Sequence, residues 1–251
     1  MSNSRLTLLL AFLILHILSS CGSPGSRDLE VFVSPTHGKI RYGLAEPLPE
    51  SGANHGEMGR VVLVIPPGQQ GISDVFEDVQ LVWKEQSNNW GFVFVCPVAD
   101  EIRFFPRSDY GWFGQGAEEK IPDIVEHLRK NVLRINQKMV LLDIGGNGNG
   151  IISILEQSPD SFALAVLAPA FDVDYDAFER YFAEVYPPIL VIYGGDRRTS
   201  FETWLEERKF PEDSVLVERL QLEPLYRVGM GNERLRSDYA REICRILVNR
   251  Y

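Results

Sequence analysis

Residues 139–155 read Met-Val-Leu-Leu-Asp-Ile-Gly-Gly-Asn-Gly-Asn-Gly-Ile-Ile-Ser-Ile-Leu. The apolar start predicts a buried strand, and the apolar run after the last glycine predicts the start of a helix. The glycines of residues 145–150 permit a tight turn in which the strand and helix backbones approach closely. A strand, a glycine turn and a helix in this order are typical of an α/β fold, whose functional groups lie in loops at the carboxyl ends of the strands.

Other apolar runs predict further strands of the same sheet. Residues 61–65, 92–97, 162–167 and 189–193 are continuous and apolar, as expected of strands buried on both faces. Residues 29–34 and 39–44 are separated by Pro35 and Gly38, which predicts a hairpin at a sheet edge.

Helical patterns lie between these strands. The clearest covers residues 118–135, and a closing helix runs from about residue 234 to the C-terminus. Each has an apolar stripe; the stripes are Ile121, Ile124, Val125, Leu128 and Val132, and Leu235, Tyr239, Ile243 and Leu247. Strands that alternate with helices predict a mostly parallel central sheet with helices on both faces.

Composition narrows the class of protein. The 251 residues are 45% hydrophobic and 24% charged, which is ordinary for a globular protein. The formal net charge of −10 repels the phosphate backbone, so nucleic acid is not expected as a partner. Three scattered cysteines predict no metal cluster, and we expect no cofactor. We expect residues 28–251 to form one domain.

The N-terminus has features of an export signal. Residues 6–18 are apolar, follow Arg5, and are short for a transmembrane helix. The run ends in Leu18-Ser19-Ser20-Cys21, which resembles the bacterial lipobox. This resemblance implies a lipoprotein signal peptide at residues 1–20, acylation of Cys21, and a short linker at residues 21–27. The alternative is a conventional signal peptide that is cleaved nearby, with Cys21 as a bystander.

The lipobox resemblance also implies a location. An acylated Cys21 would anchor the protein to a membrane of the bacterial cell envelope. Gly22 follows, where the common enterobacterial sorting rule has an aspartate that retains lipoproteins at the inner membrane. Glycine in place of aspartate at this position favours the outer membrane.

Three short motifs resemble the α/β-hydrolase superfamily, in particular its secreted esterase and polyester-depolymerase branch. Residues 145–150 occupy the place of the family elbow, G-x-S-x-G-G. Residues 158–163, Ser-Pro-Asp-Ser-Phe-Ala, and residues 110–113, Tyr-Gly-Trp-Phe, are similar to segments of the same branch. The resemblance implies an α/β-hydrolase fold from about residue 61 to the C-terminus, although fold alone does not establish activity.

The same alignment implies a degenerate catalytic site. The nucleophile position falls on Asn147 or Gly148, neither of which can attack an ester as an activated hydroxyl does. The histidine position falls on Asn232, and no histidine follows His127. Asp196 lies one place before the family's acid position. We therefore expect no catalytic residue at the family positions.

The resemblance to the family still implies a binding cleft. Gly68, Gln69 and Gln70 lie in the segment that matches the oxyanion loop, where backbone N–H groups bind a carbonyl oxygen or an anion. The other residues expected to line the cleft are Trp112, Gly146, Asn147 and Gly148. The alternative is a plain strand-to-helix turn with aromatic packing beside it.

These observations leave three hypotheses. The first is a membrane-anchored lipoprotein that binds an unknown small molecule or envelope partner without hydrolysis. The second is an active carboxylic-ester hydrolase with an atypical active site. The third is a phosphate or dinucleotide module built on residues 145–150, whose spacing matches neither G-x-G-x-x-G nor a P-loop.

Overall fold

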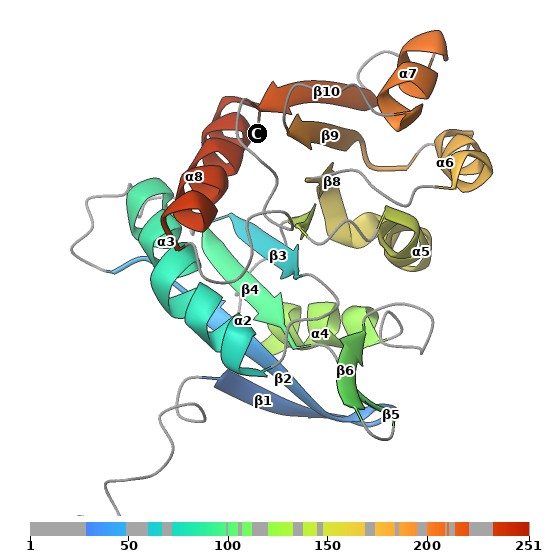
Figure 1. Cartoon of the computed structure of the whole chain (residues 1–251). Coiled ribbons are helices and arrows are strands. Elements are labelled where there is room, and N and C mark those ends of the chain that lie inside the picture. The colour runs from blue at the N-terminus through green and yellow to red at the C-terminus, as the bar shows by residue number, and fades with distance from the viewer. Residues whose placement is uncertain are drawn as a thin grey trace, which may run out of the picture.

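The elements are those of a computed structural model (Figure 1). The structure describes residues 29–48, 60–66, 72–98, 100–104, 107–111, 120–132, 138–144, 148–168, 174–183, 186–194, 200–208, 210, 214–220 and 233–250. The strands are β1 (Leu29–Ser34), β2 (Gly38–Ala45), β3 (Val61–Ile65), β4 (Val93–Pro97), β5 (Asp100–Phe104), β6 (Arg107–Gly111), β7 (Met139–Asp143), β8 (Phe162–Leu167), β9 (Ile189–Gly194) and β10 (Val215–Leu220). The helices are α2 (Ile72–Asp78), η2 (Val79–Trp83), α3 (Lys84–Trp90), α4 (Lys120–His127), η3 (Leu128–Val132), α5 (Gly148–Gln157), η4 (Pro159–Ser161), α6 (Tyr175–Phe182), α7 (Ser200–Glu207) and α8 (Glu233–Arg250).

The central sheet has eight strands in the order β1-β2-β4-β3-β7-β8-β9-β10. β2 pairs antiparallel with β1 and β4, and the remaining neighbours pair parallel. β5 and β6 form a separate antiparallel pair. The prediction of a mostly parallel sheet with an antiparallel hairpin at its edge is confirmed.

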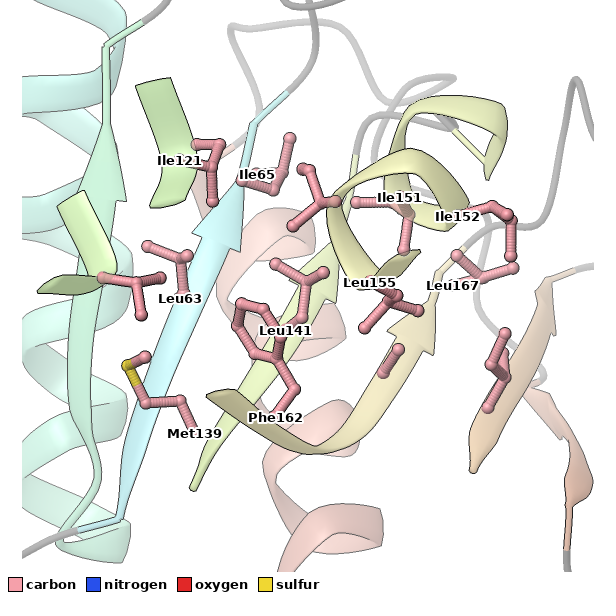
Figure 2. Packing of buried hydrophobic residues seen from close by; sticks show 14 of the residues in the cluster. Leu63, Ile65, Ile121, Met139, Leu141, Ile151, Ile152, Leu155, Phe162 and Leu167 are labelled. Atoms are coloured by element: carbon pink, nitrogen blue, oxygen red, sulfur yellow. The ribbon is translucent and has the colours of Figure 1, made fainter. Parts of the chain in front are cut away.

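Successive residues of the inner strands point into two different cores. Leu63, Ile65 and Leu141 belong to one core, with buried side chains of α4, α5, α6 and α7. Val62 and Val64 belong to the other, with buried side chains of α2, η2 and α8. Figure 2 shows the first core, in which side chains of α5 lie over those of β7 and β8. Helices therefore cover both faces of the sheet, and continuous apolar strands are required to fill both cores.

Helix α3 ends at a left-handed glycine, and two π-helical turns lie beside the α-helices. Gly91 has φ 75°, and its N–H bonds the Ser87 carbonyl at 2.9 Å, which closes α3 with a left-handed residue. η2 is a π-helical turn between α2 and α3, and η3 is a π-helical turn directly after α4. Ile121 and Leu128 are buried, as the apolar stripe of residues 118–135 predicts.

The N-terminal predictions lie outside the described residues. The signal peptide at residues 1–20 and the linker at residues 21–27 precede Leu29, where the description begins. Among the described helices, none combines the length and apolar character needed to cross a bilayer.

Candidate functional site

The carboxyl ends of three neighbouring strands meet at one edge of the sheet. The Ile144 N–H after β7 bonds the Ile65 carbonyl of β3 at 3.1 Å, and the Ala168 N–H after β8 bonds the Asp143 carbonyl of β7 at 2.8 Å. Because the strands end level, the segments that follow them leave from the same edge, which is where α/β sheets build ligand sites.

Gly148 is the candidate site residue that the structure describes. It is buried and is the first residue of α5, the first helix after β7 along the chain. Ile151 and Leu155 of α5 are fully buried, so packing fixes the helix against the sheet. The predicted strand and the helix that follows it are confirmed, but the predicted start of the helix, after the last glycine at Ile151, is wrong. Helix α5 begins at Gly148, so Gly148 and Gly150 belong to its first turn. Glycine adopts helical as well as turn conformations, so the sequence alone does not place this boundary. The other candidates lie outside the described residues; they are Cys21, Gly68, Gln69, Gln70, Trp112, Gly146, Asn147, Asp196 and Asn232.

Asp143 is a buried carboxylate at this edge that the sequence analysis does not single out. It is the last residue of β7, pairs with Ile65 and Leu167 in the parallel ladder, and has 0% of its surface exposed. A charged group is rarely buried without a structural or functional reason. The signal in the sequence is a single carboxylate in an apolar strand, two residues before the glycine turn.

Ser153 lacks the surroundings of a nucleophile. Its hydroxyl accepts a hydrogen bond from the Gln157 side-chain amide at 3.1 Å, one turn along α5. Both residues face away from the core, since the buried stripe of α5 is formed by Ile151, Ile154 and Leu155. An amide donor cannot take up a proton from a hydroxyl, so this pairing does not activate Ser153.

His127, at the end of α4, is used in packing. Its ring stacks on Phe32 at 4.2 Å between centroids, and its Nε2 lies 3.4 Å from the Tyr42 hydroxyl. Burial lowers the pKa of His127, against the opposite effect of Glu30. The lowered pKa favours the neutral imidazole, which is part of the contact between α4 and the first two strands.

His37 belongs to a cluster of three residues that we call the Ser34–Asp123–His37 clamp. The Ser34 hydroxyl donates to Asp123 Oδ2, and His37 Nδ1 lies 2.9 Å from the same oxygen. The Ser34 hydroxyl also accepts from the backbone N–H groups of Thr36 and His37 at 3.0 and 2.9 Å. The clamp therefore ties the β1–β2 turn to α4.

The clamp contains the residue types of a hydrolytic triad in an order that cannot work as one. In a triad the imidazole contacts the serine hydroxyl and the carboxylate orients the imidazole. Here the carboxylate of Asp123 stands between Ser34 and His37, and Ser34 is 2% exposed. The imidazole cannot receive the serine proton, which makes the clamp a structural element.

Both described histidines are far from the glycine turn. Phe32 and Tyr42, which contact His127, lie on β1 and β2, and β4 and β3 separate β2 from β7. At about 4.8 Å per strand, β2 lies roughly 14 Å from β7. A general base must come within about 3 Å of the proton that it removes, so neither described histidine serves a site at the turn.

The clamp predicts a dependence of stability on pH. The hydrogen bond from Ser34, with the histidine contact, holds the pKa of Asp123 below its ordinary value despite partial burial. A carboxyl with a lowered pKa contributes stability above its ordinary pKa, about 3.9, and loses it as the pH falls through the folded-state pKa. Asp123→Asn is therefore expected to cost stability at pH 7, and this cost should shrink as the pH falls below about 4, as measured by urea unfolding.

Asp160→Asn is the matched control for this measurement, because the Asp160 side chain is fully exposed and lies 4.0 Å from Lys138. Its unfolding midpoint should equal that of the wild type at both pH values. A cost of Asp123→Asn that stays constant between pH 7 and pH 3 would contradict the role assigned to the Asp123 carboxylate.

Aromatic side chains gather between α6 and α7, a feature that sequence spacing does not reveal. Phe178 is fully buried and its ring lies 5.1 Å from Phe201 and 5.9 Å from Trp204. Arg208 covers Trp204 at 5.7 Å and pairs with Glu179 at 2.9 Å. This cluster holds α6 and α7 together on the face of the sheet that the first core occupies. Within the described part of the chain, no three metal-ligating side chains come together.

Comparison with known proteins identifies structural neighbours. No family model and no curated sequence matches the chain. An S-formylglutathione hydrolase from Agrobacterium tumefaciens superposes with a TM-score of 0.57 at 15% identity, over 88% of this chain and 94% of that one. An α/β serine hydrolase without a lid from Xanthomonas campestris gives 0.54 at 16% identity, over 86% and 93%.

A thermostable esterase superposes with a TM-score of 0.57 at 15% identity, over 88% of this chain. The match spans 62% of the length of that esterase. At such identities the likeness is one of fold. The eight-stranded sheet order, the helices on both faces and these neighbours together show that the chain has the α/β-hydrolase fold.

Proposed function

We propose that the chain is a lipoprotein of the bacterial cell envelope, anchored by acylated Cys21, whose α/β-hydrolase domain binds a small molecule or an envelope partner without hydrolysing it. The observation that carries the non-catalytic part is the place of the histidines. His37 and His127 are held at the β1–β2 end of the sheet, and no histidine follows His127 in the sequence.

The sequence at the turn supports the same proposal. Neither Asn147 nor Gly148 carries a hydroxyl, thiol or carboxylate that could attack an ester. A chain without this nucleophile and base still has backbone N–H groups at the start of α5, which favour a carbonyl oxygen or an anion. Binding without turnover is the function that this combination favours.

The alternative, an ester hydrolase with an atypical site, draws on the names of the structural neighbours. Those names describe an esterase, an S-formylglutathione hydrolase and a serine hydrolase. Under this alternative, a serine elsewhere in the chain would be the nucleophile.

A hydrolysis assay separates the two functions. The full chain in nonionic detergent is incubated with short-chain and longer-chain aryl esters and, in parallel, with a serine-directed phosphonate. We expect no turnover above the uncatalysed rate and no phosphonate adduct by mass spectrometry. The esters should still bind, as measured by equilibrium dialysis with the unreacted ester.

Asn147→Ala is the informative variant. We expect it to leave the background rate unchanged and to alter ester binding, because it changes the turn without removing a nucleophile. Turnover by the wild type that falls in Asn147→Ala, or a phosphonate adduct on any serine, would overturn the non-catalytic proposal in favour of the hydrolase.

A further inference from the structure

The outer side of the β1–β2 hairpin is a surface of mixed apolar and basic character. The antiparallel register places Val31 opposite Arg41 and Val33 opposite Lys39, so these four side chains share one face of the sheet. We call them the hairpin face. The alternate residues of β1 point to the other side, where Phe32 contacts α4.

Neighbouring helices leave the hairpin face uncovered. Helix η2 covers the next pair on this side, Leu29 and Gly43, because a Cβ added to Gly43 would lie 2.5 Å from Val79 Cγ2. Beyond that pair the cover ends, and Val31 is 50% and Val33 70% exposed. Lys39 and Arg41 are exposed too.

The hairpin face carries the opposite charge to the chain as a whole. The chain has a formal net charge of −10, whereas the two charged side chains of this face are both basic. Among the described residues, no carboxylate forms an ion pair with either of them. Exposed apolar side chains beside unpaired cations match the interface of an anionic bilayer, which takes up both.

The position of the hairpin face in the chain supports the same occupant. β1 is the edge strand of the sheet, at the end opposite β10 (Figure 1). Val31 follows Cys21 by ten residues, which reach at most about 35 Å when extended. An acyl anchor on Cys21 would therefore keep this face near the membrane surface. Two copies pairing through this face would bring four positive charges together, which disfavours a dimer.

We propose that the hairpin face docks on the anionic headgroups of the membrane that holds Cys21, with Val31 and Val33 toward the acyl region and Lys39 and Arg41 on phosphates. This inference rests on the anchoring part of the proposed function. It gives the domain a fixed orientation, in which β10 lies seven strand spacings, about 34 Å, from the docked strand.

A fluorescent label at position 33 tests the docking. Cys96 and Cys244 are buried, and burial raises the pKa of both thiols, so they react poorly in the folded chain. In the acylated full chain, Val33→Cys therefore supplies the reactive thiol for an environment-sensitive dye. We expect a blue shift in phosphatidylglycerol-containing vesicles and none in pure phosphatidylcholine vesicles. Val217→Cys, 45% exposed on β10, is the matched control and should show no shift in either.

Charge variants test the basic residues. In the labelled chain, Lys39→Glu/Arg41→Glu is expected to lower the ratio of docked to undocked domain by roughly tenfold or more, because each basic residue contributes separately to binding an anionic surface. Arg241→Glu/Arg245→Glu makes the same change in net charge on α8, where both arginines pair with nearby carboxylates. This control should leave the blue shift unchanged.

Four results would overturn the inference. If the chain floats with the vesicles but the dye at position 33 shows no shift, the anchor holds and the hairpin face does not dock on the membrane. Equal shifts in both kinds of vesicle would exclude the role of Lys39 and Arg41. A shift that grows with the protein-to-lipid ratio would assign the face to a second copy of the chain. A chain that does not float would refute the anchor itself.

Discussion

Replacing Cys21 with alanine is expected to move the chain from the membrane fraction to the soluble fraction. Each methylene of an acyl chain buried in the bilayer contributes about 0.8 kcal/mol, and stable anchoring takes more than one chain. A lipobox cysteine carries several acyl chains, so its loss should remove nearly all of the membrane recovery. The measurement is fractionation of bacteria that express the full chain, combined with metabolic labelling by a fatty-acid analogue.

Ser19→Ala is the matched control, because alanine is also a small residue at that lipobox position. It should keep both the membrane recovery and the acyl label. Unchanged membrane recovery of Cys21→Ala would refute the lipid anchor. Cleavage of the wild type without an acyl label would instead support a conventional signal peptide with Cys21 as a bystander.

The inner strands could be predicted because burial on both faces leaves a continuous apolar run. Residues 61–65 and 162–167 are the bounds that the structure gives to β3 and β8. The β1–β2 hairpin was also predictable, since Gly38, with φ 71°, is the left-handed residue at which the turn ends and β2 begins.

Three strands that lack a continuous apolar run, β5, β6 and β10, were not predicted. β10 contains Glu218, and its Val217 is 45% exposed, so it lacks the continuous apolar run of an inner strand. β5 and β6 read Asp-Glu-Ile-Arg-Phe and Arg-Ser-Asp-Tyr-Gly, in which half of the residues are charged. The π-helical turns were also missed, because one added residue per turn hardly changes an apolar stripe.

The candidate site could be located but not built from the sequence. The glycine-rich segment marks the place of the site in the sequence, because it lies between a strand and a helix and Gly148 starts that helix. The Ser34–Asp123–His37 clamp could not be inferred, because its members are 89 and 86 positions apart and meet only when α4 packs on β1 and β2. The structural contacts of His37 and His127 likewise depend on tertiary packing, which the sequence pattern does not reveal.

Replacing Phe178 with alanine is expected to be the most destabilising of these changes, at about 3–5 kcal/mol. Phe178 is fully buried in α6, and its ring lies 4.8 Å from Phe182 and 5.9 Å from Phe210, besides the contacts to α7. The cavity would remove packing from both helices at once. Urea and thermal unfolding, followed by circular dichroism in nonionic detergent, should show a drop in Tm of roughly 10 °C.

Phe182→Ala separates burial from aromatic content. Phe182 has the same side chain, lies one turn further along α6 and touches Phe178, Tyr181 and Phe210, yet it is only partly buried. Its loss should cost about 1–2 kcal/mol, because part of its surface already faces water. Equal costs for the two variants would mean that α6 is not docked through Phe178. The unequal costs that we expect would show that one buried ring holds α6 and α7 together on the sheet.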